Sequence, residues 1–96
     1  MKLEQEIITW AEEKGIFEKS TPIAQHHKTI EEVQEILHGI LLHNIEEIKD
    51  GIGDTIVTLV IQAKMNGLTI DECVEHAYNI IKDRTGSMQN GLFVKD

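Results

Sequence analysis

Apolar positions recur at helical spacing through most of the chain and predict four helices. Residues 2–14 carry an apolar side chain every three or four positions until Gly15 ends the pattern. Thr21 and Pro22 mark the start of the next helix, because a threonine hydroxyl can cap a helix and proline fits its first position. Gly67 separates the last two helices, and Thr69 begins the fourth. The predicted helices span residues 2–14, 21–43, 45–66 and 69–84.

Turn-forming residues fill the segments between and after these helices. Residues 16–20 are predicted to form a loop, and Asn90-Gly91 favours a tight turn within a short C-terminal tail or hairpin. The predicted fold class is therefore all-α, a four-helix bundle with residues 1–96 as a single domain. A chain of this length buries only about 60–65% of its unfolded surface. We therefore expect homodimerisation, or a higher homo-oligomer, to complete the core.

The two middle helices carry clustered acidic residues on either side of a short break near His43. Since a helix rises about 1.5 Å per residue, acids at similar distances from the break lie nearly level on antiparallel helices. The first of these helices has its acids on one stripe and its apolar residues on the opposite side, which is typical of a helix with a solvated acidic face. The acids before the break are Glu31, Glu32 and Glu35, and those after it are Glu47, Asp50 and Asp54.

The second acidic helix changes this interpretation. Its residues are apolar almost all round, so we expect it to be largely buried. Carboxylates in such a stripe would cost several kcal/mol in desolvation unless a cation compensates. Lys28 and Lys49 are too few cations to neutralise this cluster of carboxylates. Clustered carboxylates are hard oxygen ligands, which suit Mg²⁺, or Mn²⁺ as an alternative.

Composition narrows the possible partners. The chain has 17 acidic and 9 basic residues and a formal net charge of −8, which argues against binding to nucleic acid or to a membrane surface. We find no apolar run of membrane-spanning length and no signal peptide pattern, so we expect a cytoplasmic protein. The single cysteine, Cys73, fits a reducing compartment and is expected to be a core residue, not a nucleophile.

The sequence gives less support to a di-iron site, a zinc site or nucleophilic catalysis. Glu35 and His38 have the Glu-x-x-His spacing of a di-iron bundle, but no second copy of that spacing exists. The five histidines do not converge with cysteine in a zinc pattern, and no phosphate-binding loop or nucleophile motif is present. Trp10, the only tryptophan, is expected in the core or a subunit interface, with the wall of a base-binding pocket as the alternative.

The order of these motifs resembles a known family. The run from Gln25 and Lys28 to Glu31-Glu32-x-x-Glu35 is similar to the Gln-x-x-Lys-x-x-Glu-Glu-x-x-Glu segment of the MazG-like, all-α nucleoside triphosphate pyrophosphohydrolases. The stretch from Asp50 to Asp54 resembles the segment where that family has Glu-x-x-Asp. The C-terminal residues 81–95 resemble the ending of its short, phage-type members.

One position departs from the family pattern. The glutamate that the family has three residues before the motif aspartate is Gly51 here. Asp50 lies one turn before Asp54 on nearly the same stripe, and we favour it as the replacement. Glu47 remains an alternative, because Glu47-x-x-Asp50 satisfies the motif one turn earlier.

The resemblance implies hydrolysis of an NTP or dNTP between the α- and β-phosphates, with magnesium at a site that forms across a homodimer. It assigns metal binding to Glu32, Glu35, Asp50 and Asp54, and makes Glu31, with Glu32 and Glu35, the catalytic carboxylates. Candidates for phosphate binding are Lys28, Lys82, Arg84 and Lys95. Two alternatives remain: the same fold acting on another pyrophosphate, such as a phosphoribosyl nucleotide, or a non-enzymatic helical dimerisation module.

Overall fold

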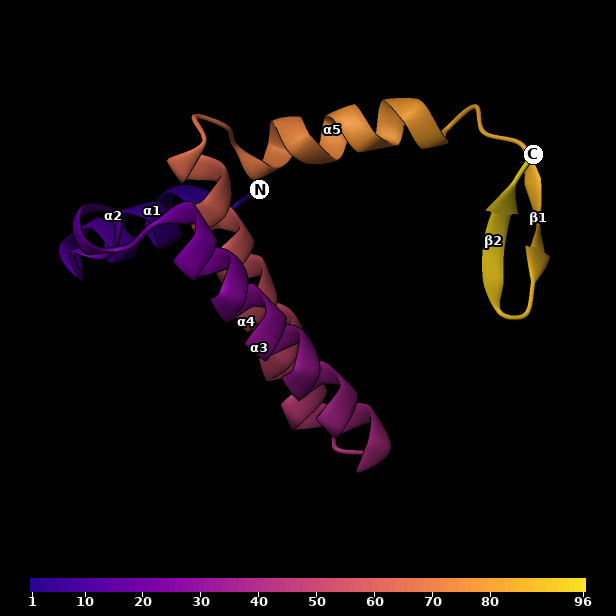
Figure 1. Ribbon diagram of the computed structural model, residues 1–96, viewed down its shortest axis with the longest axis horizontal. Helices are drawn as coiled ribbons and strands as arrows, with labels where there is room; N and C mark the ends of the chain where they lie inside the picture. Colours follow the sequence, from indigo (N-terminus) through magenta and orange to yellow (C-terminus); the bar gives the residue numbers. More distant parts are fainter.

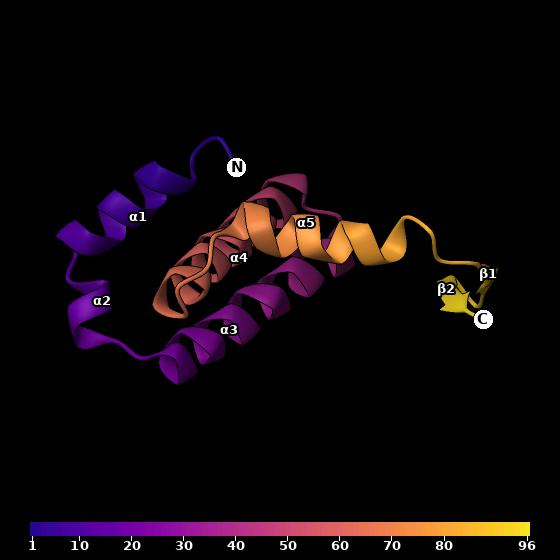
Figure 2. The same cartoon turned by 90° about the horizontal axis from the view of Figure 1, so that it is seen from above.

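The computed structural model describes residues 1–96 and confirms the all-α class, with a small hairpin at the C-terminus (Figures 1 and 2). Helices α3 and α4 form a long antiparallel pair, α1 lies along α4, and α5 leads away from both. None of the helices is both long and apolar enough to cross a membrane. The elements are α1 (Glu4–Glu13), α2 (Ile16–Lys19), α3 (Pro22–Leu41), α4 (Ile45–Met65), α5 (Ile70–Ile81), β1 (Gly86–Gln89) and β2 (Leu92–Lys95).

Side-chain caps set the helix starts where the sequence placed them. The Thr21 and Asn44 side chains each accept a hydrogen bond, 3.1 Å long, from the backbone N–H three residues further on. Thr69 and Glu72 form the predicted capping box at α5. Two boundaries were predicted wrongly. Residues 16–20 are not all loop, because Ile16–Lys19 forms a helical turn, and α5 ends at Ile81 instead of near residue 84.

Two glycines allow α3 and α4 to pack closely. A Cβ atom on Gly51 would lie 3.1 Å from the backbone nitrogen of Ile36, and one on Gly39 would lie 2.9 Å from that of Ile48. Gly39 and Gly51 are therefore the points where the backbones of the two helices come closest. Gly53 faces open space instead, with no atom within 4 Å of a Cβ added there.

The face of α3 that packs on α4 is the more polar one, contrary to the usual amphipathic arrangement. Thr29 and Gly39 are its buried residues, and the hydroxyls of Thr29 and Thr58 lie 2.7 Å apart between the two helices. The apolar stripe of α3 points away from α4 and stays exposed. Its members and their exposed fractions are Ile23 73%, Ile30 46%, Val33 46%, Leu37 49% and Leu41 69%.

The core of the single chain is small and lies where α1 meets the C-terminal half of α4. It consists of Ile8, Ala11, Val60, Ile61 and Ala63. The expectation that α4 is largely buried is wrong for one chain, because apolar residues on its outer side remain open to solvent, as Ile52 does. The N-terminal part of α4, which α1 does not reach, has no helix packed on its outer side.

Helix α5 and the hairpin form an arm that extends from this body (Figure 1). The chain exposes 7282 Å², whereas a compact monomer of its mass would expose about 5,600 Å². Its radius of gyration is 15.7 Å, against about 12.5 Å for a compact chain of this length. About 1,700 Å² of surface is therefore left without cover by this chain.

Candidate active site

A cavity of about 530 Å³ opens where α1, α2, α3 and α4 meet. Glu32 of α3 and Asp54 of α4 both line it, so carboxylates from two helices share one concave space. The remainder of its wall is partly apolar and partly polar. It includes Trp10, Ile16, Gln25, Lys28, Val57 and Ile61.

Glu32 is the most enclosed of the predicted site acids, with 14% of its side chain exposed. Lys28 lies one turn earlier, and its Nζ is 3.3 Å from an oxygen of Glu32 and 3.3 Å from one of Glu31. The hydrogen bond to Glu32 and then that to Glu31 raise the pKa of Lys28 above its ordinary value. This lysine therefore stays charged and holds the two carboxylates on adjacent positions of α3.

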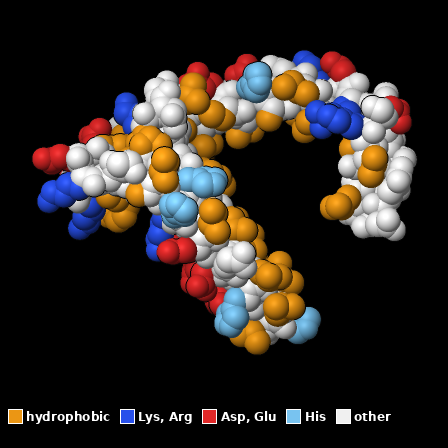
Figure 3. Space-filling view, in the orientation of Figure 1, with side chains coloured by type: hydrophobic (Ala, Val, Ile, Leu, Met, Phe, Trp, Pro, Cys, Tyr) orange, Lys and Arg blue, Asp and Glu red, His pale blue; other side chains and the backbone are white.

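Glu31 and Asp54 are more open than Glu32. The side chain of Glu31 is 69% exposed, and Asp54, Asp50 and Glu35 are also exposed residues. The desolvation cost predicted for the acids of α4 therefore does not arise at Asp50 and Asp54, which are exposed. The enclosed acids are Glu32 and Glu47, with 14% and 22% of their side chains exposed. In one chain the acids form a largely hydrated stripe along one side of the α3–α4 pair, where Figure 3 shows Asp and Glu side chains gathered opposite an apolar side.

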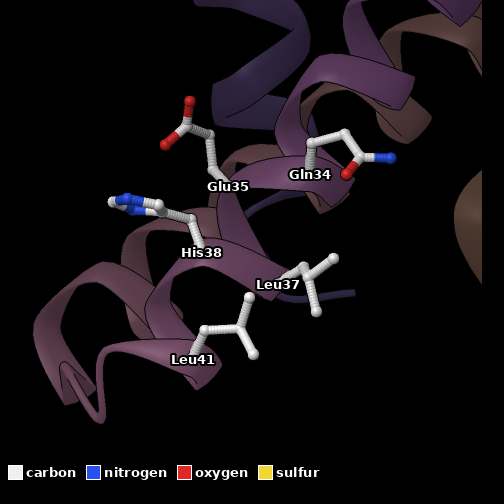
Figure 4. Close-up of a pocket in the computed structure, with 5 residues that line it drawn as sticks. All are labelled: Gln34, Glu35, Leu37, His38 and Leu41. Atoms are coloured by element: carbon white, nitrogen blue, oxygen red, sulfur yellow. The ribbon is translucent and has the colours of Figure 1, made fainter.

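A second group of possible ligands lies further along this stripe, toward the α3–α4 turn. Glu35, His38 and Glu47 each offer an atom within 4.8 Å of the others. His38 Nδ1 pairs with Glu47 across the two helices, and this contact raises the pKa of His38 above its ordinary value. Glu35 thus lies beside Glu47 and not in the cavity of Glu32 and Asp54, and it lines a separate hollow on α3 (Figure 4).

The fold explains the glycine at position 51. Because Gly51 is buried against α3, a side chain at this position would point into the helix contact and not toward the cavity. Asp50 is exposed on the same stripe as Asp54. Of the two candidates to replace the family glutamate, Glu47 lies next to Glu35, while Asp50 lies on α4 between Glu47 and Asp54.

The C-terminal cations do not reach this cavity within one chain. Lys82 follows the last turn of α5, Arg84 lies between α5 and the hairpin, and Lys95 ends β2. Figures 1 and 2 place this end of the chain well away from α1 and the start of α3. Lys28 is the one predicted phosphate-binding residue that lines the cavity.

Trp10 is not a core residue, because 47% of it is exposed. Its indole lines the cavity together with Glu32 and Asp54, the position that the sequence analysis held as the alternative. Ile16 and Val57 also line the cavity and were not predicted. The loop predicted for residues 16–20 carries no signal for a cavity residue at Ile16. Val57 lies on the same side of α4 as Asp54, but its place in the cavity wall depends on how α1 packs on α4, which the sequence pattern does not show.

The donor set suits a hard divalent cation. Glu32 of α3 and Asp54 of α4 bring carboxylates to the lining of one cavity, which has no thiolate of the kind that softer metals favour. Lys28, already paired with Glu31 and Glu32, adds one positive charge to this acidic wall. A further cation is therefore needed before a polyanionic molecule can bind here.

Comparisons with known proteins agree with the motifs. The family model described as the MazG nucleotide pyrophosphohydrolase domain matches residues 20–88, which include every acid discussed above. An uncharacterized 18.2 kDa protein from the rep-hol intergenic region of Haemophilus phage HP1 is 42% identical over 65 residues. The match covers 68% of this chain and 40% of that phage protein, so the chain spans less than half of its relative. No solved structure gives a significant match.

Proposed function

Because the chain belongs to the MazG nucleotide pyrophosphohydrolase family, we propose that it is a magnesium-dependent nucleoside triphosphate pyrophosphohydrolase. Its substrate is an NTP or dNTP, which it cleaves between the α- and β-phosphates to give the monophosphate and pyrophosphate. The observation that carries this proposal is the cavity in which Glu32, Asp54, Lys28 and Trp10 meet. Carboxylates, a cation and an aromatic face are the groups that a metal-bound nucleotide requires.

Glu32 and Asp54 are the residues that would hold Mg²⁺, or Mn²⁺ in its place. Glu35 and Asp50, which lie further along the same acidic stripe on exposed and adaptable side chains, complete the proposed ligand set. A bound divalent ion would supply Lewis-acid chemistry, since it draws charge from phosphate oxygens and makes a water molecule more acidic.

The chain's own residues position the reactants. Lys28 is held by Glu31 and Glu32 at 3.3 Å, so its ammonium group stays at the cavity wall, where it attracts a phosphate oxygen. Glu31 is the proposed general base. A water oxygen forms a bond to phosphorus, and Glu31 takes the proton that the water loses. The bridging P–O bond between the α- and β-phosphates breaks, and the leaving phosphate keeps the bridging oxygen with its electron pair, which gives the monophosphate and pyrophosphate.

The apolar part of the cavity is the proposed binding site for the nucleobase. Trp10 presents a half-exposed indole, with Ile16, Val57 and Ile61 in the same wall. Stacking of a base on an aromatic side chain is worth about 1–3 kcal/mol and tolerates any base. This arrangement favours a nucleotide over inorganic polyphosphate as the substrate.

We also propose that a homodimer, in the cytoplasm, is the active form. The exposed apolar stripe of α3 and the roughly 1,700 Å² of excess surface correspond to the amount each subunit buries in a large, obligate interface. Lys82, Arg84 and Lys95 do not line the cavity of their own chain. Any contact of these three cations with substrate therefore requires a second copy.

A pyrophosphate-release screen with Mg²⁺ across common and modified nucleotides tests the proposal. We expect release by the wild-type chain and a loss of at least about a hundredfold in kcat for Glu32→Gln and Asp54→Asn. Asp83→Asn, an exposed aspartate beyond α5, serves as the matched control and should retain activity. Retained activity in Glu32→Gln and Asp54→Asn would remove the cavity from the reaction.

The screen also separates the alternatives. Release from a phosphoribosyl nucleotide and from no free nucleoside triphosphate would assign the fold to that other pyrophosphate. No release from any substrate, together with thermal melting that is insensitive to Mg²⁺, would favour a non-enzymatic dimerisation module. Because Trp10 is the only tryptophan, quenching of its fluorescence by nucleotide reports occupation of the cavity directly.

A further inference from the structure

An open hollow on α3 lies beside the proposed active site and shares only Glu35 with its proposed ligand set. It has a volume of about 430 Å³ and is lined by Gln34, Glu35, Leu37, His38 and Leu41 (Figure 4). Leu37 and Leu41 are 49% and 69% exposed and form its apolar part, while the Glu35 and His38 side chains extend from the other side. Nothing in the same chain covers this hollow, so it has one apolar wall and one acidic edge.

The C-terminal hairpin carries apolar side chains and a cation on one face, which complement the apolar wall and the acidic edge of the hollow. Its strands pair Met88 with Phe93 and Gly86 with Lys95, and directly paired residues share one face of a hairpin. One face therefore carries Met88, Phe93 and Lys95, two large apolar side chains beside one cation. Met88 is 66% exposed and Phe93 50% exposed, so the apolar part of this face is also without cover.

The hairpin is formed within the single chain. Asn90 and Gly91 both have positive φ angles, 53° and 82°, which match the tight turn that suits the twist of paired strands. The Thr85 hydroxyl donates to a carboxylate oxygen of Asp96 at 2.8 Å and so closes the open end. An isolated two-stranded hairpin is nevertheless marginal in water, and it needs packing on one face to persist.

We propose that the hairpin of a second copy of this chain docks into the α3 hollow. Met88 and Phe93 cover Leu37 and Leu41, and Lys95 lies against Glu35. The chain has a net charge of −8, so two copies repel unless cations such as Lys95 meet acids at the contact. The claim concerns assembly and holds whether or not the chain hydrolyses nucleotides.

The occupant is a second copy because the arm carries the hairpin away from its own α3. Figures 1 and 2 show α5 leading away from the loop that follows the C-terminal end of α4, with the hairpin at its far end, and Figure 1 shows open space between the hairpin and α3. In Figure 3 apolar side chains face this space from α3 and α4, from the underside of α5 and from the hairpin. The uncovered surface of about 1,700 Å² per chain is what an exchange of such arms would bury in a large interface.

Directed cysteine cross-linking between two differently tagged full-length chains tests this contact. Both chains carry Cys73→Ser; one also carries Leu41→Cys and the other Phe93→Cys. We expect a disulfide-linked pair of unlike chains on mild oxidation, since a disulfide requires Cβ atoms about 3.5–4.5 Å apart. Val94→Cys is the matched control, because Val94 is the next residue along β2, is similarly exposed at 42% and points to the opposite face. It should not cross-link with Leu41→Cys.

Sedimentation of the unmodified assembly gives a second readout. Phe93→Ser should raise the dimer dissociation constant at least about tenfold, and Lys95→Glu about two- to fivefold, with recovery when Glu35→Lys is added. Circular dichroism of each variant checks that the helices remain folded. Absence of the unlike-chain disulfide, equal cross-linking through Val94→Cys, or a Phe93→Ser chain that dimerises as wild type would each overturn the proposal.

Discussion

The contact between α3 and α4 can be tested with two glycines that lie two residues apart. Gly51 is buried against Ile36, whereas Gly53 faces open space. We consider the substitutions Gly51→Ala and Gly53→Ala. Both sites are in the interior of α4, so alanine brings the same gain in helix propensity, about 1 kcal/mol, at each. Any difference between the two variants therefore reports what surrounds the new methyl group.

The coordinates set the size of that difference. At position 51 the methyl carbon would lie 2.8 Å from Ile36 Cγ1, 3.1 Å from its nitrogen and 3.3 Å from its Cα. The side-chain atom can rotate away, but the two backbone atoms move only if the helices separate. Inserting a methyl group into such a contact costs about 1–3 kcal/mol. We therefore expect Gly51→Ala to be about 1–3 kcal/mol less stable than Gly53→Ala.

Thermal and urea unfolding, followed by circular dichroism at equal chain concentration, measures this difference. For a chain of about 100 residues each kcal/mol shifts the midpoint by about 4–8 °C, so Gly53→Ala should melt at least about 4 °C above Gly51→Ala. Equal midpoints would show that α3 and α4 are further apart than described here. A loss of stability in Gly53→Ala as large as that in Gly51→Ala would show that another surface packs on position 53.

Three further predictions concern polar contacts. Glu4→Gln should weaken the docking of α1 on α5, because the Glu4 carboxylate accepts a hydrogen bond of 2.6 Å from the first backbone N–H of α5; denaturation should give a loss of about 1–2 kcal/mol. Thr29→Val removes the buried hydroxyl that bonds Thr58 across the helix pair and accepts from the Gln62 amide, and should cost about 1–3 kcal/mol. The exposed Thr9→Val should change stability by less than about 0.5 kcal/mol. The pair of His38 with Glu47 raises the pKa of His38, so its stabilisation is complete below the ordinary value of about 6.5 and is lost as pH rises through the raised value. Denaturation at about pH 6 and about pH 9 should therefore show the stability difference between wild type and His38→Gln shrinking with pH; a difference that grows would contradict the pairing.

Local signals in the sequence were sufficient for the helix starts and the hairpin. Thr21, Asn44 and Thr69 act through residues three positions away, and the Asn90-Gly91 turn depends on its own dihedral angles. Such short-range effects are visible without knowledge of the fold. The short helix α2 was missed because a single helical turn has too few residues to show a period.

The burial of the helices could not be predicted in the same way. Apolar periodicity indicates which side of α3 is apolar, but not that this side stays exposed in one chain while a threonine and glycine face packs on α4. The close approach at Gly39 and Gly51 selects that face, because only residues without a Cβ allow the backbones to meet there. For the same reason the sequence predicted burial for the acids of α4, whereas the most enclosed acids are Glu32 of α3 and Glu47 of α4, with 14% and 22% of their side chains exposed.

The acidic site was predictable in part. The rise of antiparallel helices placed Glu35 level with Asp54, but the structure brings Glu32, and not Glu35, into one cavity with Asp54. Glu35 lies beside His38 and Glu47 instead. This difference depends on how far the two helices are shifted along each other, which the sequence does not specify. The contribution of Trp10 to the cavity depends on how α1 lies against α4, a long-range contact that no local pattern encodes.

Binding of Mn²⁺, followed by the loss of the free-ion signal in electron paramagnetic resonance, tests the central claim most directly. If Glu32 and Asp54 form a divalent-cation site, the wild-type chain and Asp83→Asn should bind the ion alike, and Asp54→Asn should bind it at least about tenfold more weakly. Circular dichroism should show all three chains equally helical. Equal Mn²⁺ binding by the wild-type chain and Asp54→Asn, or no binding by the wild-type chain, would contradict the account.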